Sequence, residues 1–408
     1  METLRVGPGG VGGVRWQGGW MRTVRDVDVS GRRVLVRVDF NVPLEDGEVA
    51  DDTRLRASLP TITYLLERNA KVILCSHLGR PGGEVVEELR LDPIAKRLSE
   101  LIDVGVIKAG DCVGEAVEAR AKDLEPGQVF LLENTRFHPG EKANDPKFAA
   151  RLAGLAEIYV NDAFAAAHRA HASTEGVAHL LPSAAGLLME REIEVLRRVR
   201  ENPKHPFAAI FGGAKISDKI GILDQLMDRM EMVLVGGGMA NTFLKAQGHE
   251  MGESLVEEAS LDTAREILEA AGEKLVLPVD LVVADAFDAE AKHHAVLVDQ
   301  VPPGWRALDV GPRTVDLFRE KLKGAKMILW NGPLGVFEME LFSKGTYAIV
   351  GTLAEHEAET ITGGGETAAA VNEVNLADKM THVSTGGGAF LTFMEGETLP
   401  GVAALGEG

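Results

Sequence analysis

Short apolar runs alternate along the chain with longer segments of helical periodicity. The apolar runs are continuously hydrophobic, which is typical of strands buried on both faces of a parallel sheet. In the first half, the expected strands are RVLVRVD (33–39), KVILCSH (71–77), VFLLEN (129–134) and IYVND (158–162). In the second half, they are FAAIFG (207–212), MVLVGG (232–237), KLVLP (274–278), DLVVAD (280–285), MILWNG (327–332), ETITGG (359–364) and HVSTGG (382–387).

Helical segments lie between these runs, for example ASLPTITYLLERN (57–69) and ISDKIGILDQLMDRM (216–230). The alternation of strands and helices predicts an α/β fold with two doubly wound parallel sheets. Such sheets bind ligands outside the carboxyl ends of their strands. The residues that follow each strand are therefore the first candidates for a functional site.

The segment 185–203 is the expected junction between two domains. Its apolar residues recur at helical spacing, and Asn202-Pro203 ends the pattern. We interpret it as an interdomain helix between domains at 21–184 and 204–390; an ordinary surface helix of one domain is the alternative. Residues 1–20 show no periodicity, so we expect a disordered and dispensable extension there.

Chain length, net charge and cysteine content exclude several classes of protein. A chain of 408 residues with 45% hydrophobic residues can form two or more domains. Its formal net charge of −19 argues against nucleic acid or an anionic membrane as a partner. The two cysteines, Cys75 and Cys112, indicate a reducing, cytoplasmic location. No apolar run approaches the ~20 residues of a membrane span, and the first 20 residues lack the apolar core of a secretory signal.

Basic residues gather at the predicted strand ends of the first half. These residues and their polar neighbours are Asp39, Asn41, Arg54, His77, Arg80, Arg136, His168, Arg169 and His171. A single arginine is more typical of a surface salt bridge, but their shared position in an acidic protein predicts a pocket for a small anion. His168 and His171 have the spacing of a metal pair, yet no further ligands stand near them in sequence, and we expect packing or hydrogen-bonding roles.

Three glycine triplets follow predicted strands of the second half: 236–238, 363–365 and 386–388. Backbone N–H groups of glycine loops and helix N-termini bind phosphate without side-chain bulk. Lys215 and Lys219, in GGAKISDKI, add positive charge. The chain has neither a Walker A motif nor a complete dinucleotide fingerprint, so a nucleotide site here is of another kind.

Nine motifs, in order, resemble those of the phosphoglycerate kinase family from about Met21 to the C-terminus. They are VRVDFNVP, SHLGRP, NTRFHPGE, NDAFAAAHRAH, GGAKISDKI, GGGMANTF, WNGPLGVFE, GGGETAA and HVSTGGGA. The resemblance implies two Rossmann-like domains, a linking helix, and a C-terminal tail (391–408) that returns to the N-terminal domain. It also implies a monomeric glycolytic kinase that closes when MgATP or MgADP and 3-phosphoglycerate or 1,3-bisphosphoglycerate bind.

The resemblance also implies the site residues. The triose site corresponds to Asp39, Asn41, Arg54, His77, Arg80, Arg136 and Arg169. The nucleotide site corresponds to Gly212, Ala214, Lys215, Lys219, Gly236, Gly311, Asn331, Pro333, Glu338, Gly364, Gly365, Glu366 and Thr367. The groups expected to stabilise the transferred phosphoryl group are Arg54, Lys215, Lys219, Gly364, Gly386 and Gly387. An ionised carboxylate is the attacking group, so no general base is required.

Three residues depart from the family pattern. Ala165 stands where glycine is usual, Phe390 where serine is usual, and Glu366 where the family has the aspartate that contacts magnesium. Two other functions stay open at this point. One is a catalytically silent nucleotide- and anion-binding protein of the same fold, and the other is a different acyl-phosphate kinase.

Overall fold

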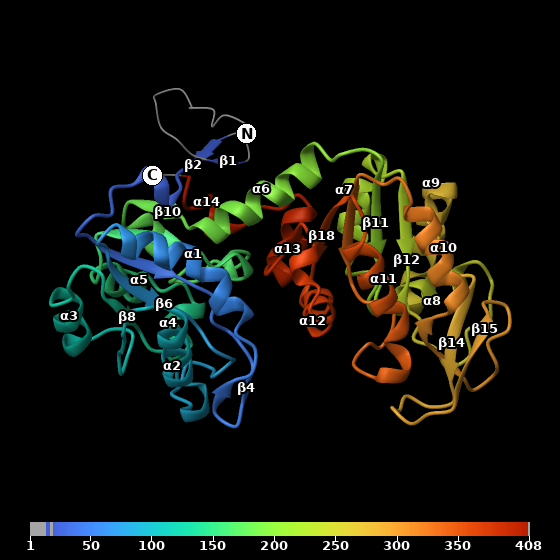
Figure 1. Ribbon diagram of the computed structural model, residues 1–408, viewed down its shortest axis with the longest axis horizontal. Helices are drawn as coiled ribbons and strands as arrows, with labels where there is room; N and C mark the ends of the chain where they lie inside the picture. The colour runs from blue at the N-terminus through green and yellow to red at the C-terminus, as the bar shows by residue number, and fades with distance from the viewer. Residues whose placement is uncertain (1–13, 17–18, 407–408) are drawn as a thin grey trace. The chain divides into compact units, whose positions relative to one another are not determined.

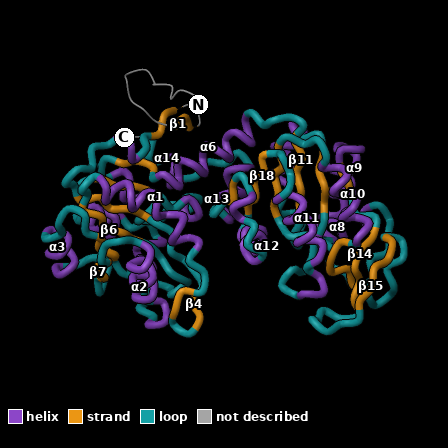
Figure 2. Tube along the Cα trace, in the orientation of Figure 1, coloured by secondary structure: helices purple, strands orange, loops and turns teal. Residues whose placement is uncertain are grey.

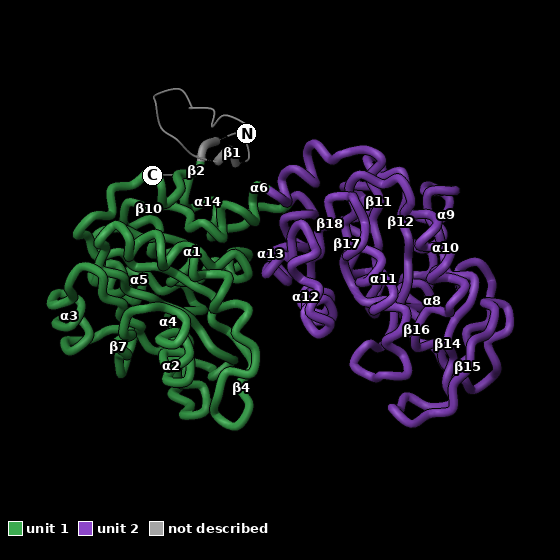
Figure 3. The backbone as a smooth tube through the Cα atoms, viewed as in Figure 1, with its two compact units in different colours: residues 1–194, 397–408 green, residues 195–396 purple. Residues whose placement is uncertain are grey.

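The computed structural model describes residues 14–16 and 19–406, with side chains from Met21 onward. The chain divides into two compact units, one made of residues 1–194 and 397–408 and the other of residues 195–396 (Figure 3). The division falls within helix α6 (Leu187–Glu201), inside the segment expected to link two domains. The last segment of unit 1 begins at residue 397, later than the expected tail at 391.

Unit 1 is built on a six-stranded sheet of parallel strands in the order β10-β9-β3-β6-β8-β7. Figure 1 labels three of them, β10, β6 and β8. The strands are β3 (Arg33–Arg37), β6 (Lys71–Cys75), β7 (Val106–Lys108), β8 (Val129–Leu131), β9 (Ile158–Asn161) and β10 (Ser183–Ala185). Four of them were predicted. The edge strands β7 (VIK) and β10 (SAA) were missed because β7 ends in a lysine and β10 consists of serine and alanine, so neither forms a run of large apolar residues. The strand order reverses between β3 and β9, which makes this the switch point of the sheet.

Helices pack around this sheet (Figure 2). They are α1 (Thr53–Glu67), α2 (Asp92–Leu101), α3 (Glu115–Lys122), α4 (Pro139–Lys142), α5 (Pro146–Ala153) and α14 (Pro400–Ala403). A hairpin of β4 (Leu44–Glu45) and β5 (Glu48–Val49) precedes α1. The apolar face of α1, with Leu55, Ile62 and Leu65, belongs to the core that the strands β3 and β6 also line.

The last residues of the chain complete unit 1. The Gly401 N–H donates to the carbonyl of Ala167 at 2.9 Å, and the Asn161 side-chain amide donates to the carbonyl of Gly401 at 3.1 Å. Leu399 and Val402 are fully buried. The terminal segment is therefore a structural part of unit 1.

The start of the chain differs in part from the expected unstructured extension. Residues 1–13 and 17–18 lie outside the described residues, so the prediction stays untested there. Val14–Trp16 (β1) and Gly19–Met21 (β2) pair as short antiparallel strands, which corrects the prediction for these residues. Val14, Trp16 and Trp20 are β-branched or aromatic, residue types that favour strands even where no periodicity shows.

The start of α6 is held by a buried carboxyl group. Asp162 follows β9, and its Oδ1 accepts hydrogen bonds from the N–H groups of Leu188 at 2.9 Å and Met189 at 3.3 Å. Burial raises the pKa of Asp162 to about 7, against these hydrogen bonds, which lower it. The residue at position 186, next to this carboxyl group, has to be glycine, because a Cβ there would lie 2.1 Å from Asp162 Oδ1.

Unit 2 has its own six-stranded parallel sheet, in the order β13-β12-β11-β17-β18-β19. Its strands are β11 (Phe207–Phe211), β12 (Met232–Val235), β13 (Leu275–Val276), β17 (Met327–Asn331), β18 (Glu359–Gly363) and β19 (His382–Val383). The helices of this unit are α7 (Ile220–Leu226), α8 (Gly237–Ala246), α9 (Leu261–Ala271), α10 (Pro312–Leu322), α11 (Lys344–Ala354), α12 (Gly365–Glu373) and α13 (Gly387–Met394). The strand order reverses between β11 and β17.

A second, antiparallel sheet in unit 2 corrects the prediction for DLVVAD (280–285). This run forms β14 (Asp280–Ala284), the central strand between β15 (His293–Leu297) and β16 (Arg306–Val310). A central strand of a covered antiparallel sheet is buried as thoroughly as a parallel strand, so the hydrophobic run alone cannot distinguish the two. None of the helices in the described part of the chain has the length and apolar character needed to cross a membrane.

Candidate active site

The predicted anion-binding residues of unit 1 lie on loops that leave the carboxyl ends of neighbouring strands. Asp39 and Asn41 follow β3, and His77 and Arg80 follow β6. Arg136 follows β8 and Arg169 follows β9, while Arg54 is in the first turn of α1. Since β9, β3, β6 and β8 are consecutive in the sheet, these loops meet at one edge, which includes the switch point.

Arg54 is fixed by two contacts that leave most of its donors free. Its Nη1 donates to Asp39 Oδ2 at 2.8 Å and to the carbonyl of Asn41 at 3.1 Å. Asp39 Oδ1 in turn accepts from the Asn41 N–H at 3.1 Å, and its side chain is 9% exposed. The Arg54 side chain remains 33% exposed, so the guanidinium is oriented but accessible.

His77 is held neutral by its surroundings. Burial lowers the pKa of His77 well below its usual range, and the nearby positive charges of Arg37, Arg136, Arg54 and Arg169 act in the same direction. Arg37 Nη2 lies 3.0 Å from Nδ1 of His77. Because arginine can only donate, His77 accepts at Nδ1 and carries its proton on Nε2.

Arg37 lies beside the candidate site and was missed by the sequence interpretation. It is 1% exposed, and its Nε donates to Ser173 Oγ at 2.7 Å. Ser173 Oγ donates to Glu141 Oε1 at 2.6 Å, and Glu141 is fully buried. The sequence did contain an indication of this role, because a charged residue inside the apolar run RVLVRVD requires buried hydrogen-bond partners.

The remaining cations differ in exposure. Arg136 is 8% exposed, and its Nη1 donates to the carbonyl of Gly79 at 2.7 Å, while Nε has no hydrogen-bond partner among the described residues. Burial lowers the pKa of Arg136 to about 10, and Arg37 and Arg169 add to this effect. Arg169 and Arg80 are exposed on their loops, and Arg169 Nε donates to His168 Nε2 at 3.0 Å. The mutual repulsion of these cations is of the kind that a bound anion would relieve.

His171 is also neutral near pH 7. Burial lowers the pKa of His171 to about 4, helped by the charges of Arg136, Arg37 and Arg169. Its Nδ1 lies 4.0 Å from Glu141 Oε1. Burial likewise lowers the pKa of His168.

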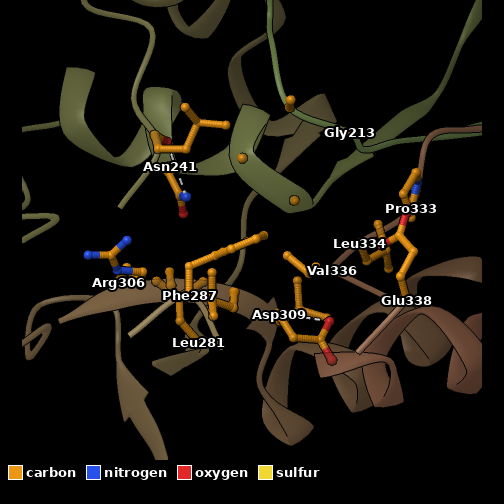
Figure 4. Close-up of a pocket in the computed structure, with 18 of the residues that line it drawn as sticks. Gly213, Asn241, Leu281, Phe287, Arg306, Asp309, Pro333, Leu334, Val336 and Glu338 are labelled. Atoms are coloured by element: carbon orange, nitrogen blue, oxygen red, sulfur yellow. Dashed lines mark hydrogen bonds between the residues drawn. The ribbon is translucent and has the colours of Figure 1, made fainter. Parts of the chain in front are cut away.

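Unit 2 has a cleft of about 430 Å³ beside its own switch point (Figure 4). Four residues of the predicted nucleotide site line it: Ala214, Pro333, Glu338 and Glu366. Lining residues that were not predicted include Asn241, Leu255, Phe287, Arg306 and Asp309. Phe287, Arg306 and Asp309 belong to the antiparallel sheet or its loops, which the sequence pattern did not predict.

Packing between loops accounts for several of the glycines. Gly237 has φ +63°, and a Cβ there would lie 2.8 Å from the carbonyl oxygen of Gly213. A Cβ at Gly212 would lie 2.1 Å from the carbonyl oxygen of Pro333. The backbones of the loops after β11, β12 and β17 therefore contact each other directly. This contact accounts for the glycines without a ligand.

The other predicted nucleotide residues do not line the cleft. They are Gly212, Lys215, Lys219, Gly236, Gly311, Asn331, Gly364, Gly365 and Thr367. Lys219 is 9% exposed at the start of α7, and burial lowers its pKa, opposed by Asp218 and Glu366. Asn331 donates to the carbonyl of Gly363 at 2.6 Å, while its Oδ1 is buried without a partner among the described residues.

The predicted phosphoryl-stabilising glycines stand at two helix N-termini. Gly364 precedes α12, and Gly386 and Gly387 open α13. Gly364 has φ +94°, and a Cβ there would lie 2.7 Å from Nδ2 of Asn331. The positive ends of both helices thus lie at the carboxyl ends of β18 and β19.

Asp309 is a buried acid in the cleft wall. It is 3% exposed and accepts hydrogen bonds from the N–H groups of Val310 at 2.9 Å and Gly345 at 2.8 Å. Burial raises the pKa of Asp309 to about 7 in spite of these bonds. The wall near Asp309 therefore bears little negative charge below neutral pH.

Among the described residues, Asp111, Cys112 and His138 form one group of possible metal ligands, within 4.8 Å of one another. Cys112 Sγ donates to the carbonyl of Glu133 at 2.9 Å, and burial raises the pKa of the thiol well above its usual range. A buried thiol that stays protonated is a poor ligand. We therefore assign this group a structural role, with His138 Nε2 paired to Asp111 Oδ1 at 2.6 Å.

Each unit thus has a candidate ligand site beside its own sheet switch point: a cluster of cations in unit 1 and a glycine-rich cleft in unit 2. Anion-binding cations and a glycine-rich cleft on such sheets are typical of a phosphotransferase that acts on small molecules. The family model described as phosphoglycerate kinase matches residues 24–397. The chain belongs to the phosphoglycerate kinase family.

Individual relatives agree over almost the whole chain. A phosphoglycerate kinase of Moorella thermoacetica is 57% identical over 388 residues, which is 94% of this chain and 99% of the relative. The phosphoglycerate kinase of Pelotomaculum thermopropionicum is 56% identical and covers 94% of this chain and 98% of its own. The solved structure of phosphoglycerate kinase from Coxiella burnetii has a TM-score of 0.83 at 43% identity, covering 94% of this chain and 98% of that one.

The activity follows from this membership. The protein is a glycolytic kinase that transfers a phosphoryl group reversibly between ATP and the carboxylate of 3-phosphoglycerate, giving 1,3-bisphosphoglycerate and ADP. These similarities support the kinase and not the catalytically silent alternative.

Proposed function

We propose that unit 1 binds the triose and unit 2 binds the nucleotide, with the residues that the family motifs predict. In unit 1 these are Asp39, Asn41, Arg54, His77, Arg80, Arg136 and Arg169. The observation that supports this most is the shared electrostatic field: the charges of Arg54, Arg136 and Arg169 all act on the one buried ring of His77. An anion with a phosphate and a carboxylate relieves that repulsion.

In unit 2, the proposed nucleotide contacts extend from the base to the phosphates. Glu338 lines the cleft and accepts from the ribose hydroxyls. Lys215, Lys219 and the N–H groups around Gly364 bind the phosphates. The unpartnered Oδ1 of Asn331, beside Gly363, supports a ligand at this point.

The transfer step needs charge stabilisation and no proton transfer. An ionised carboxylate oxygen of 3-phosphoglycerate forms a bond to the γ-phosphorus of ATP, and the bond from that phosphorus to the bridging oxygen breaks, so that ADP leaves with both electrons. Arg54, Lys215, Lys219 and the helix N-termini at Gly364, Gly386 and Gly387 stabilise the charge on the moving group. The two ligands must be in line, so the units have to close when both are bound.

Magnesium fits the carboxylate of Glu366. This side chain is exposed in the first turn of α12 and lines the cleft, and a carboxylate oxygen is the ligand type that magnesium prefers. Bound there with the nucleotide phosphates, the ion would neutralise part of their charge. Glu366 also acts electrostatically on Lys219, which places the two groups in one region.

Glu366 is expected to make metal placement less strict than aspartate would. Its side chain is longer by one methylene, a bond of roughly 1.5 Å, and magnesium demands near-octahedral geometry. The manganese-to-magnesium ratio of kcat/KM should therefore be higher in the wild type than in Glu366→Asp. An unchanged ratio would show that Glu366 does not govern metal placement, and wild-type rates in Glu366→Ala would remove it from the site.

Binding measurements test whether unit 1 binds the triose and unit 2 binds the nucleotide. Arg136→Ala should weaken the binding of 3-phosphoglycerate about tenfold or more and leave the affinity for ADP unchanged. The reason is that a buried charge-assisted contact is lost in unit 1 only. Lys219→Ala should do the reverse. Calorimetric titration of each variant with each ligand alone measures this, and Lys142→Ala, an exposed lysine change in unit 1, serves as a control. If Arg136→Ala weakened the binding of ADP as much as the binding of the triose, the assignment would be contradicted.

We also propose that the protein acts as a monomer in the cytoplasm. Each unit has its own sheet and its own apolar core, so neither needs a second chain to complete it. Both cysteines are free and buried, which suits a reducing compartment.

A further inference from the structure

A chain of buried side chains connects Glu141 to His77, and three of its four members are not among the proposed ligand contacts. Ser173 Oγ lies 2.6 Å from Glu141 Oε1 and 2.7 Å from Arg37 Nε. Arg37 Nη2 in turn lies 3.0 Å from His77 Nδ1. Glu141 and Ser173 are fully buried, Arg37 is 1% exposed and His77 is 5% exposed. The exposed fraction rises along the chain, so His77 is the member that can contact a ligand.

The hydrogens of this chain all point in a defined direction. An arginine donates and never accepts, so Arg37 donates hydrogen bonds to both of its neighbours, Ser173 and His77. The Ser173 hydroxyl uses its one hydrogen for Glu141, because a carboxylate only accepts. The other carboxylate oxygen, Oε2, accepts the Ser173 N–H at 3.0 Å. At the far end of the chain, Nδ1 of His77 is therefore an acceptor and the ring proton lies on Nε2.

The backbone fixes the middle of the chain. Arg37 Nη1 donates to the carbonyl of Val38, so all three nitrogens of the guanidinium have a partner. The Tyr159 hydroxyl donates to the carbonyl of Ser173 at 2.7 Å. Removal of the Ser173 hydroxyl would leave the buried charges of Arg37 and Glu141 without their shared partner, which is unfavourable. The chain thus holds the guanidinium in one orientation toward His77.

His77 keeps one donor that the protein does not use. None of the hydrogen bonds in the described part of the chain reaches its Nε2. Burial and the charge of Arg37 lower the pKa of the ring, so it is neutral near pH 7 and donates from one nitrogen only. A neutral donor among Arg54, Arg136 and Arg169 supplies a directed hydrogen bond without another positive charge.

We propose that Glu141 and Ser173 are positioning residues of the triose site, which act through Arg37 to fix His77 in the tautomer that donates from Nε2 to the bound triose. This inference rests on the proposed triose site. The phosphate and the carboxylate of the triose accept hydrogen bonds, so the other tautomer, with a lone pair on Nε2, would repel them. Without the chain, Arg37 no longer has a fixed orientation, and both tautomers of His77 are populated.

The test measures the tautomer of His77 and the affinity for 3-phosphoglycerate in the full-length wild type, Ser173→Ala and Glu141→Gln. Nitrogen NMR of protein with isotope-labelled histidine reports the tautomer, and the signals of His77 are identified by their absence in His77→Gln. In the wild type, Nδ1 should have the chemical shift of an unprotonated ring nitrogen.

In both variants, part of the His77 population should carry its proton on Nδ1. Calorimetry should show that the binding of 3-phosphoglycerate is weakened about tenfold, the scale of one hydrogen bond to a charged group, while the affinity for ADP is unchanged. Ser173→Thr keeps the hydroxyl group and should restore both the tautomer and the affinity.

Ser183→Ala is the matched control. Ser183 is a buried serine of the same unit, and its hydroxyl contacts the carbonyls of Ala178 and Leu181, both at 2.8 Å. This variant should leave the tautomer of His77 and the affinity for 3-phosphoglycerate unchanged.

The proposal is overturned if the tautomer of His77 is the same in the wild type, Ser173→Ala and Glu141→Gln. It is also overturned if the tautomer changes and the affinity for 3-phosphoglycerate does not. If Ser173→Ala does not fold, Glu141→Gln decides alone. Weaker triose binding in Arg136→Ala, with no effect of Ser173→Ala, would retain the triose site and reject only the role of the chain.

Discussion

Replacing Arg54 by alanine is expected to lower kcat at least ~100-fold, the scale on which removal of a charge that stabilises the transition state acts. The guanidinium is oriented by Asp39 and by the carbonyl of Asn41, and it remains accessible. Arg169→Ala should instead raise mainly KM for 3-phosphoglycerate, because the exposed Arg169 contributes binding that is the same in the ground and transition states. Steady-state kinetics with ATP and 3-phosphoglycerate give both parameters.

The matched control for Arg54 is Arg56→Ala on the same helix. Arg56 pairs with Asp52, is 55% exposed, and should change neither parameter more than about twofold, as expected for an exposed pair. Arg54→Lys should recover part of the loss, since it restores charge without the fork. If Arg54→Ala and Arg169→Ala changed kcat and KM to the same extent, the separation of their roles would be wrong.

Phe390→Ser, which restores the residue usual in the family, is expected to destabilise unit 2 by about 3–5 kcal/mol, the range for truncating a buried phenylalanine. Phe390 is fully buried in α13, and its ring lies against Gly363 at the end of β18. A Cβ at Gly363 would be 2.3 Å from Cε2 of the ring. The loss of unfolding free energy is measured by urea unfolding, monitored by fluorescence with the buried Trp330 as a reporter in this unit. Thermal unfolding monitored by calorimetry gives a second measurement.

A double-mutant cycle tests the ring contact itself. Gly363→Ala alone should be strongly destabilising, but in the Phe390→Ser background the new methyl group enters the space that the ring has left, so the two effects should not add. Leu391→Ser, half-buried on the same helix, is the control and should cost clearly less than Phe390→Ser. Additive effects of Gly363→Ala and Phe390→Ser would show that the ring does not set the position of this loop.

Hydrophobic runs were sufficient to find the central strands of both parallel sheets. The run RVLVRVD gave β3, and MILWNG gave β17, because a strand buried on both faces has to be apolar throughout. The same rule placed β14 in the wrong sheet, since pairing direction is set by partners distant in sequence. The strand β15, HHAVL, was missed because three of its five residues are exposed.

The candidate site was predicted best where several chemically similar residues follow strands. Arg54 and Arg136 were predicted in this way, and the charges of both act on His77. Arg37 was not predicted, because it lies inside a strand, where a single charge has no pattern to mark it. The structure shows its buried partners, Ser173 and His77.

The discontinuity of unit 1 determines the order in which the protein can fold during synthesis. The strands β3 to β10 leave the ribosome first, but Gly401, which binds Asn161 and Ala167, follows only after about 200 more residues, or roughly 10–40 s at ordinary elongation rates. Unit 2 is continuous in sequence and needs nothing from the C-terminus. Most of unit 2 is therefore synthesised before the segment that completes unit 1, and the nascent chain carries the sheet of unit 1 without its last helix for that time.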